Sequence, residues 1–137
     1  MKNILIDAGP LIALFDKSDS YHAQAIAFLK SFKGTLFTTW PVITEASHLL
    51  GFSVKVQIAL LEWINRGGLH LIEIEAYQIG RLIELSEKYK DVPMDLADAT
   101  LIVAAEANDI KEIATIDSDF YIYRDIRKRY LKNIFIK

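Results

Sequence analysis

Residues 3–15 read NILIDAGPLIALF and introduce the pattern that the rest of the chain repeats. The short apolar run from Asn3 to Ile6 predicts a buried strand. Asp7 follows at once, and the Gly9-Pro10 pair indicates a turn before a short helix from Pro10 to Phe15. A strand that ends on an acid and leads into a helix is the opening unit expected of an α/β fold.

The same alternation continues toward the C-terminus. Further strands are predicted over Thr35–Thr38, Leu69–Ile74, Glu112–Ile116 and Asn133–Ile136. Helices are predicted from a cap at Asp19 or Ser20 to Phe32, and over Pro41–Leu50, Val54–Asn65, Ala76–Tyr89 and Asp95–Ala107. We therefore expect one α/β domain over residues 1–137, with a mostly parallel central sheet of about five short strands.

Composition narrows the class of protein. Hydrophobic residues make up 52% of the 137 residues, enough for a sizeable core. The net charge of -2 argues against a protein that coats nucleic acid by bulk charge. The absence of cysteine excludes disulfides and thiolate metal sites. No apolar run approaches the ~18 residues of a membrane span, and no signal-peptide pattern is visible, so we expect a cytoplasmic protein without membrane association.

Positive charge concentrates near the C-terminus. Residues 124–137 contain a single acid, Asp125, among the basic residues Arg124, Arg127, Lys128, Arg129, Lys132 and Lys137. A local basic patch can bind phosphates whatever the overall charge. A solvated basic surface would produce the same pattern, and both interpretations stay open. Arg124, Arg127 and Arg129 are the candidate substrate-binding residues.

Two acids stand at the ends of predicted strands. Asp7 follows Ile4-Leu5-Ile6, and Asp117 follows the run from Ile113 to Ile116. Ligands of open parallel sheets bind beyond the carboxyl ends of the strands. Asp is also a common turn or capping residue, so neither position decides the matter alone.

Two further acids lie in apolar helices. Asp98 belongs to LADATLIVAA (96–105), which is apolar nearly all round and carries no Lys or Arg within one turn of this acid. Burial of an ionised Asp is costly without a cationic partner, and a bound metal ion is the simplest one. Asp95 lies three residues earlier on the same face, where it could act only as the helix cap. Glu45 lies on the apolar stripe of its helix, with His48 as a possible partner one turn on.

These acids predict one acidic pocket that binds a divalent cation. Its members are Asp7, Glu45, Asp98 and Asp117. Oxygen ligands suit Mg²⁺ or Mn²⁺, and a pair of such ions could activate water for phosphodiester hydrolysis. Whether one or two ions bind stays open. His22, His48 and His70 show no paired spacing, so zinc is not expected.

Four segments, in this order, resemble the PIN-domain family, particularly VapC-type toxins of toxin–antitoxin pairs. They are ILIDAGPLIAL (4–14), TEA (44–46), LADATLIVAA (96–105) and ATIDSDF (114–120). The resemblance covers nearly the whole chain and implies a three-layer α/β/α sandwich. It places the family's acidic quartet at Asp7, Glu45, Asp98 and Asp117.

The resemblance also implies an activity and partners. It implies Mg²⁺- or Mn²⁺-dependent cleavage of single-stranded RNA regions that leaves a 5′-phosphate, a homodimer, and an antitoxin whose tail covers the active site. Asp119 matches a further acid often found near the last quartet member, and Thr115 matches a supporting hydroxyl residue. Asp95 would support the same site. The chain departs from the pattern at Gly9, where many members carry Ser or Thr, and the effect on metal or water positioning stays open.

Three other classes are less consistent with the chain. A haloacid-dehalogenase-type enzyme usually needs a second Asp two positions after the first, where this chain has Gly9. A receiver domain needs paired acids near the N-terminus and a Lys after the last strand. Walker and dinucleotide-binding glycine patterns are absent. The main non-enzymatic alternative is a PIN-like module that kept the fold for binding or assembly.

Overall fold

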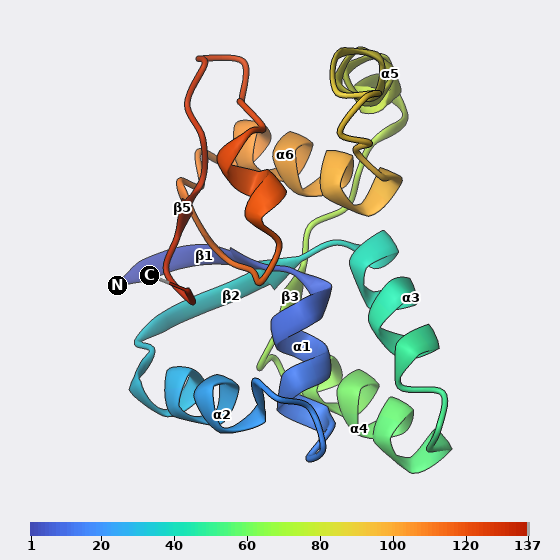
Figure 1. Cartoon of the computed structure of the whole chain (residues 1–137), viewed down its shortest axis with the longest axis vertical. Helices are drawn as coiled ribbons and strands as arrows, with labels where there is room; N and C mark the ends of the chain where they lie inside the picture. Colours follow the sequence, from blue (N-terminus) through green and yellow to red (C-terminus); the bar gives the residue numbers. More distant parts are fainter. Residues whose placement is uncertain (137) are drawn as a thin grey trace.

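The computed structural model describes residues 1–136, in which five parallel strands form one sheet in the order β3-β2-β1-β4-β5 (Figure 1). The strands are β1 (Lys2–Ile6), β2 (Gly34–Thr38), β3 (His70–Leu71), β4 (Glu112–Ala114) and β5 (Lys132–Asn133). The α-helices are α1 (Ala8–Phe15), α2 (His22–Ser31), α3 (Trp40–Leu49), α4 (Val54–Asn65), α5 (Ile79–Lys88) and α6 (Leu96–Asn108). Short 3₁₀ helices are η1 (Ala76–Gln78) and η2 (Ser118–Tyr121).

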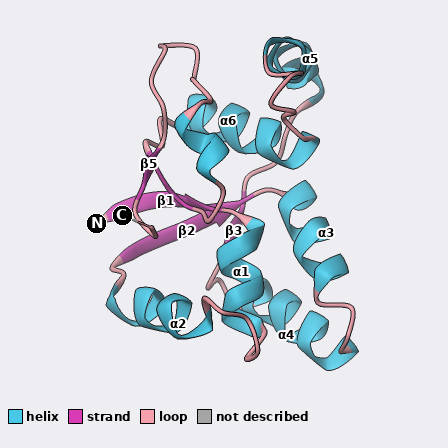
Figure 2. Cartoon of the chain, viewed as in Figure 1, coloured by secondary structure: helices cyan, strands magenta, loops and turns pink. Residues whose placement is uncertain are grey.

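Helices cover both faces of the sheet. Helices α5 and α6 lie on one side and α1, α2 and α4 on the other, as Figure 2 also shows. Helix α3 contacts both α1 and α6. The predicted three-layer α/β/α sandwich is therefore confirmed, and its described sheet is entirely parallel. Over residues 1–136, no helix has the length and apolar character that crossing a membrane would require.

The core explains why two segments are almost entirely apolar. Strand β1 is central, and Ile4, Leu5 and Ile6 are at most 1% exposed because helices cover both faces. In α6, every residue from Ala97 to Ala105 is buried. Full burial of one large apolar side chain stabilises a fold by about 1.5–3 kcal/mol, so this helix and β1 contribute much of the stability.

The starts of α1 and α2 differ from the sequence-based prediction. Helix α1 begins at Ala8 rather than Pro10, because Asp7 caps it and Pro10 falls in the first turn. Proline is tolerated there, since the first backbone N–H groups of a helix have no partner within it. Helix α2 begins at His22. Asp19 is not its cap, because its carboxylate accepts from the Tyr21 N–H at 2.8 Å and forms a turn before the helix.

The two edge strands are shorter than predicted. Strand β3 consists of His70 and Leu71 alone, and the chain leaves the sheet after the Ile72 N–H donates to the Thr38 carbonyl at 2.8 Å. Strand β5 ends at Asn133 rather than Ile136, because the Asn133 side chain accepts from the Phe135 and Ile136 N–H groups. Those donors are therefore not engaged in a strand ladder.

Strands β1 and β4 bring two distant parts of the chain together. Ile6 pairs with Ala114, and the Asp7 N–H donates to the Ala114 carbonyl at 2.9 Å. Both strands run in the same direction, so the segments that follow them leave the sheet at the same edge. Asp7 and Asp117 therefore lie at one end of the sheet.

Candidate active site

Asp7 is fixed from two sides at the end of β1. It is 7% exposed, and one carboxylate oxygen accepts from the Ala8 N–H at 2.8 Å as the cap of α1. The other oxygen accepts from the Thr115 hydroxyl, also at 2.8 Å. Burial raises the pKa of Asp7, the two hydrogen bonds oppose this, and the charges of Asp117 and Asp95 raise it further.

Thr115 connects the acids that follow β1 and β4. Its buried hydroxyl donates to Asp7 and accepts from the Asp117 N–H at 3.0 Å. The Asp117 carboxylate in turn accepts from the Asp119 N–H at 2.9 Å and caps η2. Burial, then the charge of Asp117, raises the pKa of Asp119. The residues expected to support the site thus contact its acids directly.

Asp98 enters the same region from α6. It is 7% exposed, and the Tyr123 hydroxyl donates to its carboxylate at 3.0 Å. Burial raises the pKa of Asp98 from 3.8 to about 8, with further contributions from the charges of Asp95, Asp7 and Asp117. Asp95 is the cap of α6, as the sequence allowed, because its carboxylate accepts from the Asp98 N–H at 2.8 Å.

Glu45 completes the group from α3. Its side chain is half-buried, and burial raises its pKa, as do the charges of Asp95, Asp7 and Asp117. His48 is exposed, and no hydrogen bond or ion pair joins it to Glu45 within residues 1–136. The suggested Glu45–His48 pair is therefore not formed, because His48 lies on the solvent side of α3.

Within residues 1–136, no Lys or Arg forms an ion pair with Asp7, Glu45, Asp98 or Asp117. Within the described residues, the ion pairs of Lys and Arg go to Glu84, Glu106, Asp109, Glu112 and Asp125, all outside the cluster. A divalent cation fits the cluster by charge and by its all-oxygen donors. Within residues 1–136, no group of three or more acidic or histidine side chains is arranged to bind a metal ion. The carboxylates instead accept from the Ala8 N–H, the Thr115 hydroxyl, the Asp119 N–H and the Tyr123 hydroxyl, and each of these oxygens keeps a second lone pair with which it can bind an ion.

Tyr123 and Asn133 hold the acids in place and were not predicted from the sequence. Tyr123 is fully buried, and its ring packs at 5.2 Å from the rings of Tyr89 and Phe120, which aims its hydroxyl at Asp98. Asn133 is buried and forms two hydrogen bonds with the Thr115 backbone. Its side-chain NH₂ group donates to the Thr115 carbonyl at 3.0 Å, and its side-chain oxygen accepts from the Thr115 N–H. Of these two residues, only Asn133 stands out in the sequence, because Asn is uncommon in a predicted strand.

None of the predicted substrate-binding arginines forms an ion pair with an acid of the cluster within residues 1–136. Arg129 forms ion pairs with Asp125 and Asp109. The Arg124 guanidinium lies over the Tyr130 ring, 5.0 Å from its centre. Arg127 is exposed and forms no ion pair within residues 1–136. Lys137, part of the same basic segment, lies outside the described residues.

Gly9 has a packing explanation. A Cβ atom added there would lie 3.1 Å from Cδ1 and 3.3 Å from Cβ of Ile116. A hydroxyl residue at this position would therefore require Ile116 to move. The hydroxyl that contacts Asp7 in this chain comes from Thr115.

A three-layer sandwich with clustered acids at the carboxyl edge of a parallel sheet defines a class of α/β protein with an acidic active site. The PIN domain family model matches residues 4–126, and the chain belongs to the PIN-domain family.

The relatives agree with this assignment. The chain is 28% identical over 116 residues to ribonuclease VapC26 of Mycobacterium tuberculosis, an alignment that covers 83% of this chain and 86% of that protein. Its fold is similar to VapC20 of Mycobacterium tuberculosis, described as a sarcin–ricin loop cleaving toxin (TM-score 0.81, 19% identity, 92% of this chain and 98% of that one). A second fold match is VapBC2 of Rickettsia felis, solved with a DNA fragment from its promoter (TM-score 0.64, 18% identity, 96% and 98% covered).

Proposed function

We propose that this chain is a Mg²⁺- or Mn²⁺-dependent endoribonuclease that hydrolyses RNA phosphodiester bonds, as the toxin of a toxin–antitoxin pair. Family membership and the similarity to a VapC ribonuclease support the reaction class. The observation that carries the proposal is the burial of Asp98 beside Asp7, Asp95 and Asp117 without a cationic side chain in the described cluster. Buried like charges are costly, and a divalent cation bound among them offsets that cost.

Two roles, metal binding and orientation of the attacking water, would be divided among the four acids. Asp7, Asp98 and Asp117 would hold the ion, directly or through water, and Glu45 would complete its ligands or orient the attacking water. The bound ion would supply a Lewis acid for the scissile phosphate and lower the pKa of nearby water. Glu45 suits the second role because its carboxylate is half-exposed and has a raised pKa, which allows it to accept a proton.

The supporting residues would orient these acids rather than contact RNA. Thr115 would fix Asp7 and Asp117 relative to each other, because its hydroxyl donates to the Asp7 carboxylate and accepts from the Asp117 N–H. Asp95 would keep the first turn of α6 in place, and the Asp119 N–H would orient the Asp117 carboxylate to which it donates. Arg124 and Arg127 would contact the RNA backbone, and Arg129 would contribute less because its charge is shared with two carboxylates.

The test compares the wild type with Asp98→Asn on a mixed RNA pool, with and without millimolar Mn²⁺. We expect Mn²⁺-dependent cleavage by the wild type only, with a folded variant. Full activity in the folded variant would remove Asp98 from the mechanism. If neither protein cleaves RNA and Mn²⁺ does not raise the thermal stability of the wild type, the chain is instead a PIN-like binding or assembly module.

An apolar groove would receive the antitoxin. It lies between α1, α2 and α4 and is lined by Leu14, Phe15, Ile26, Leu29, Ala59, Trp63 and Arg66. Leu29 and Trp63 give the groove apolar surface, and Arg66 adds one charge for an acidic side chain. The homodimer would use Ile79 and Ile83, which are 52% and 54% exposed one turn apart on α5. Co-purification with a small DNA-binding protein encoded in the neighbouring reading frame tests the antitoxin. The molecular mass in solution tests the homodimer.

A further inference from the structure

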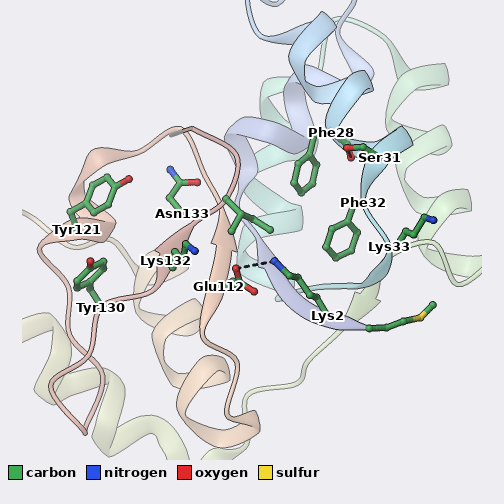
Figure 3. Close-up of a pocket in the computed structure, with 12 residues that line it drawn as sticks. Lys2, Phe28, Ser31, Phe32, Lys33, Glu112, Tyr121, Tyr130, Lys132 and Asn133 are labelled. Carbon is green, nitrogen blue, oxygen red and sulfur yellow. Dashed lines mark hydrogen bonds and ion pairs between the residues drawn. The ribbon is translucent and has the colours of Figure 1, made fainter.

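A large open groove lies away from the acidic cluster, between α2 and the segment after η2 (Figure 3). Its volume is about 980 Å³. Its walls include Phe28 and Phe32 from the α2 side, and Tyr121 and Tyr130 from the other side. Lys2, Glu112 and Lys132 belong to the strands between these walls.

The groove is positively charged. Lys2, Lys33 and Lys132 line it against one carboxylate, Glu112. Glu112 pairs with Lys2 at 3.4 Å, whereas Lys33 and Lys132 are exposed and form no ion pair within residues 1–136. Two uncompensated ammonium groups along one groove attract a polyanion.

One wall carries open aromatic rings. Tyr121 and Tyr130 are 46% and 52% exposed, and their ring centres are 6.1 Å apart. The Arg124 guanidinium stacks over the Tyr130 ring. Exposed aromatic rings beside cationic groups provide the surface on which bases of a single strand stack while their phosphates contact lysine. A double helix keeps its bases stacked inside and could not use these rings in that way.

We propose that this groove binds a single-stranded stretch of RNA outside the cleavage site. The inference rests on the proposed ribonuclease function and adds a second contact for its substrate. The groove lies at the amino ends of β1, β4 and β5, whereas the acids follow the carboxyl ends of β1 and β4. At about 3.3 Å per strand residue, Lys2 and Asp7 are roughly 16 Å apart along β1. Tyr121 is the last residue of η2, which Asp117 caps, so one short element reaches from the acids to the groove.

Binding is measured in the Asp98→Asn background, in which RNA should stay intact, by fluorescence anisotropy of a fluorescein-labelled single-stranded oligoribonucleotide of mixed sequence. The double variant Tyr121→Ala/Tyr130→Ala should raise the Kd by roughly five- to a hundredfold, as expected for lost base stacking. The matched variant Tyr121→Phe/Tyr130→Phe keeps both rings and should bind as its parent does. Circular dichroism confirms that each variant is folded.

The charge is tested separately. Lys33→Gln/Lys132→Gln should flatten the slope of log Kd against log salt by about 1.4, because two phosphate contacts are lost. Lys17→Gln/Lys55→Gln removes two exposed lysines that do not line the groove and should leave the slope unchanged. With the native acids restored, the lysine variant of the groove should raise KM for long RNA without changing kcat.

Several results would overturn the inference. Unchanged Kd values and salt slopes in the groove variants would do so. Displacement of the labelled strand by polyglutamate or duplex RNA as effectively as by unlabelled single-stranded RNA would also do so, since any polyanion would then bind. The two proposals fail separately. RNA binding that depends on the groove without any cleavage refutes the ribonuclease, whereas cleavage with normal KM in the groove variants refutes the second contact.

Discussion

Replacement of Asp98 by Asn should make the protein without metal more stable at neutral pH, although it removes the proposed activity. Asp98 is 7% exposed, and its pKa is raised from 3.8 to about 8 because burial and neighbouring acids disfavour its charge. Between these two values, the folded state holds a proton that the unfolded state has released. Stability therefore falls as pH rises from about 4 to 8. Asn keeps the shape and an acceptor for Tyr123 but does not titrate.

The size of the effect follows from the same values. One pKa unit corresponds to about 1.4 kcal/mol, so the contribution of Asp98 should change by at most about 2.5 kcal/mol between pH 5.5 and pH 7.5. The raised pKa values of Asp7 and Glu45 act in the same direction in both proteins. Asp16 and Asp125 have lowered pKa values, so their stabilising contributions are lost only at more acidic pH.

The assay is urea unfolding at pH 5.5 and 7.5 in the presence of a chelator, then with millimolar Mn²⁺. The stability advantage of Asp98→Asn should grow by about 2 kcal/mol between the two pH values. Mn²⁺ should stabilise the wild type by about 2.7 kcal/mol at a hundredfold excess over its Kd and the variant far less. Glu62→Gln, an exposed carboxylate on α4, is the control and should behave as the wild type. Equal pH slopes in Asp98→Asn and wild type, or equal gains with Mn²⁺, would refute the reasoning.

Three further predictions concern residues around the site and the groove for the antitoxin. Tyr123→Phe removes the hydroxyl that donates to Asp98, so half-maximal cleavage should need about tenfold more Mn²⁺; an unchanged Mn²⁺ titration would contradict this. Asn133→Ala leaves the Thr115 N–H and carbonyl without their partner and should lower the free energy of urea unfolding by about 2–4 kcal/mol; wild-type stability would count against it. Arg66→Glu should weaken antitoxin binding about tenfold in calorimetry and leave RNA cleavage unchanged, and equal affinity would assign the antitoxin to another surface.

The alternation of strands and helices could be predicted from the sequence because it depends on local periodicity. The buried β1 and the largely apolar α6 produce the clearest patterns, and both form where expected. Helix starts and edge strands were less predictable. The start of α2 depends on a turn made by Asp19, and the end of β5 depends on where the Asn133 side chain finds donors. Neither interaction leaves a periodic signal.

The acids could be singled out from the sequence because a carboxylate at a strand end or inside an apolar helix conflicts with its surroundings. The sequence by itself therefore determined which residues would be costly to bury and that parallel strands would deliver Asp7 and Asp117 to one edge. Only the tertiary structure decided how they are held. Tyr123 is 25 residues from Asp98, and Asn133 is 18 residues from Thr115.

The groove between α2 and the segment after η2 also depends partly on local sequence and partly on tertiary structure. Lys132, its one described basic residue near the C-terminus, was visible in the sequence, but Lys2 and the opposite wall at α2 come from about a hundred residues away in the chain. Whether a basic residue is paired, stacked or open depends on neighbours that the fold supplies. Arg129 forms an ion pair with Asp125. The Arg124 guanidinium lies over the Tyr130 ring, and Lys132 is exposed. Local sequence specifies the charge, and packing between distant segments specifies what that charge can contact.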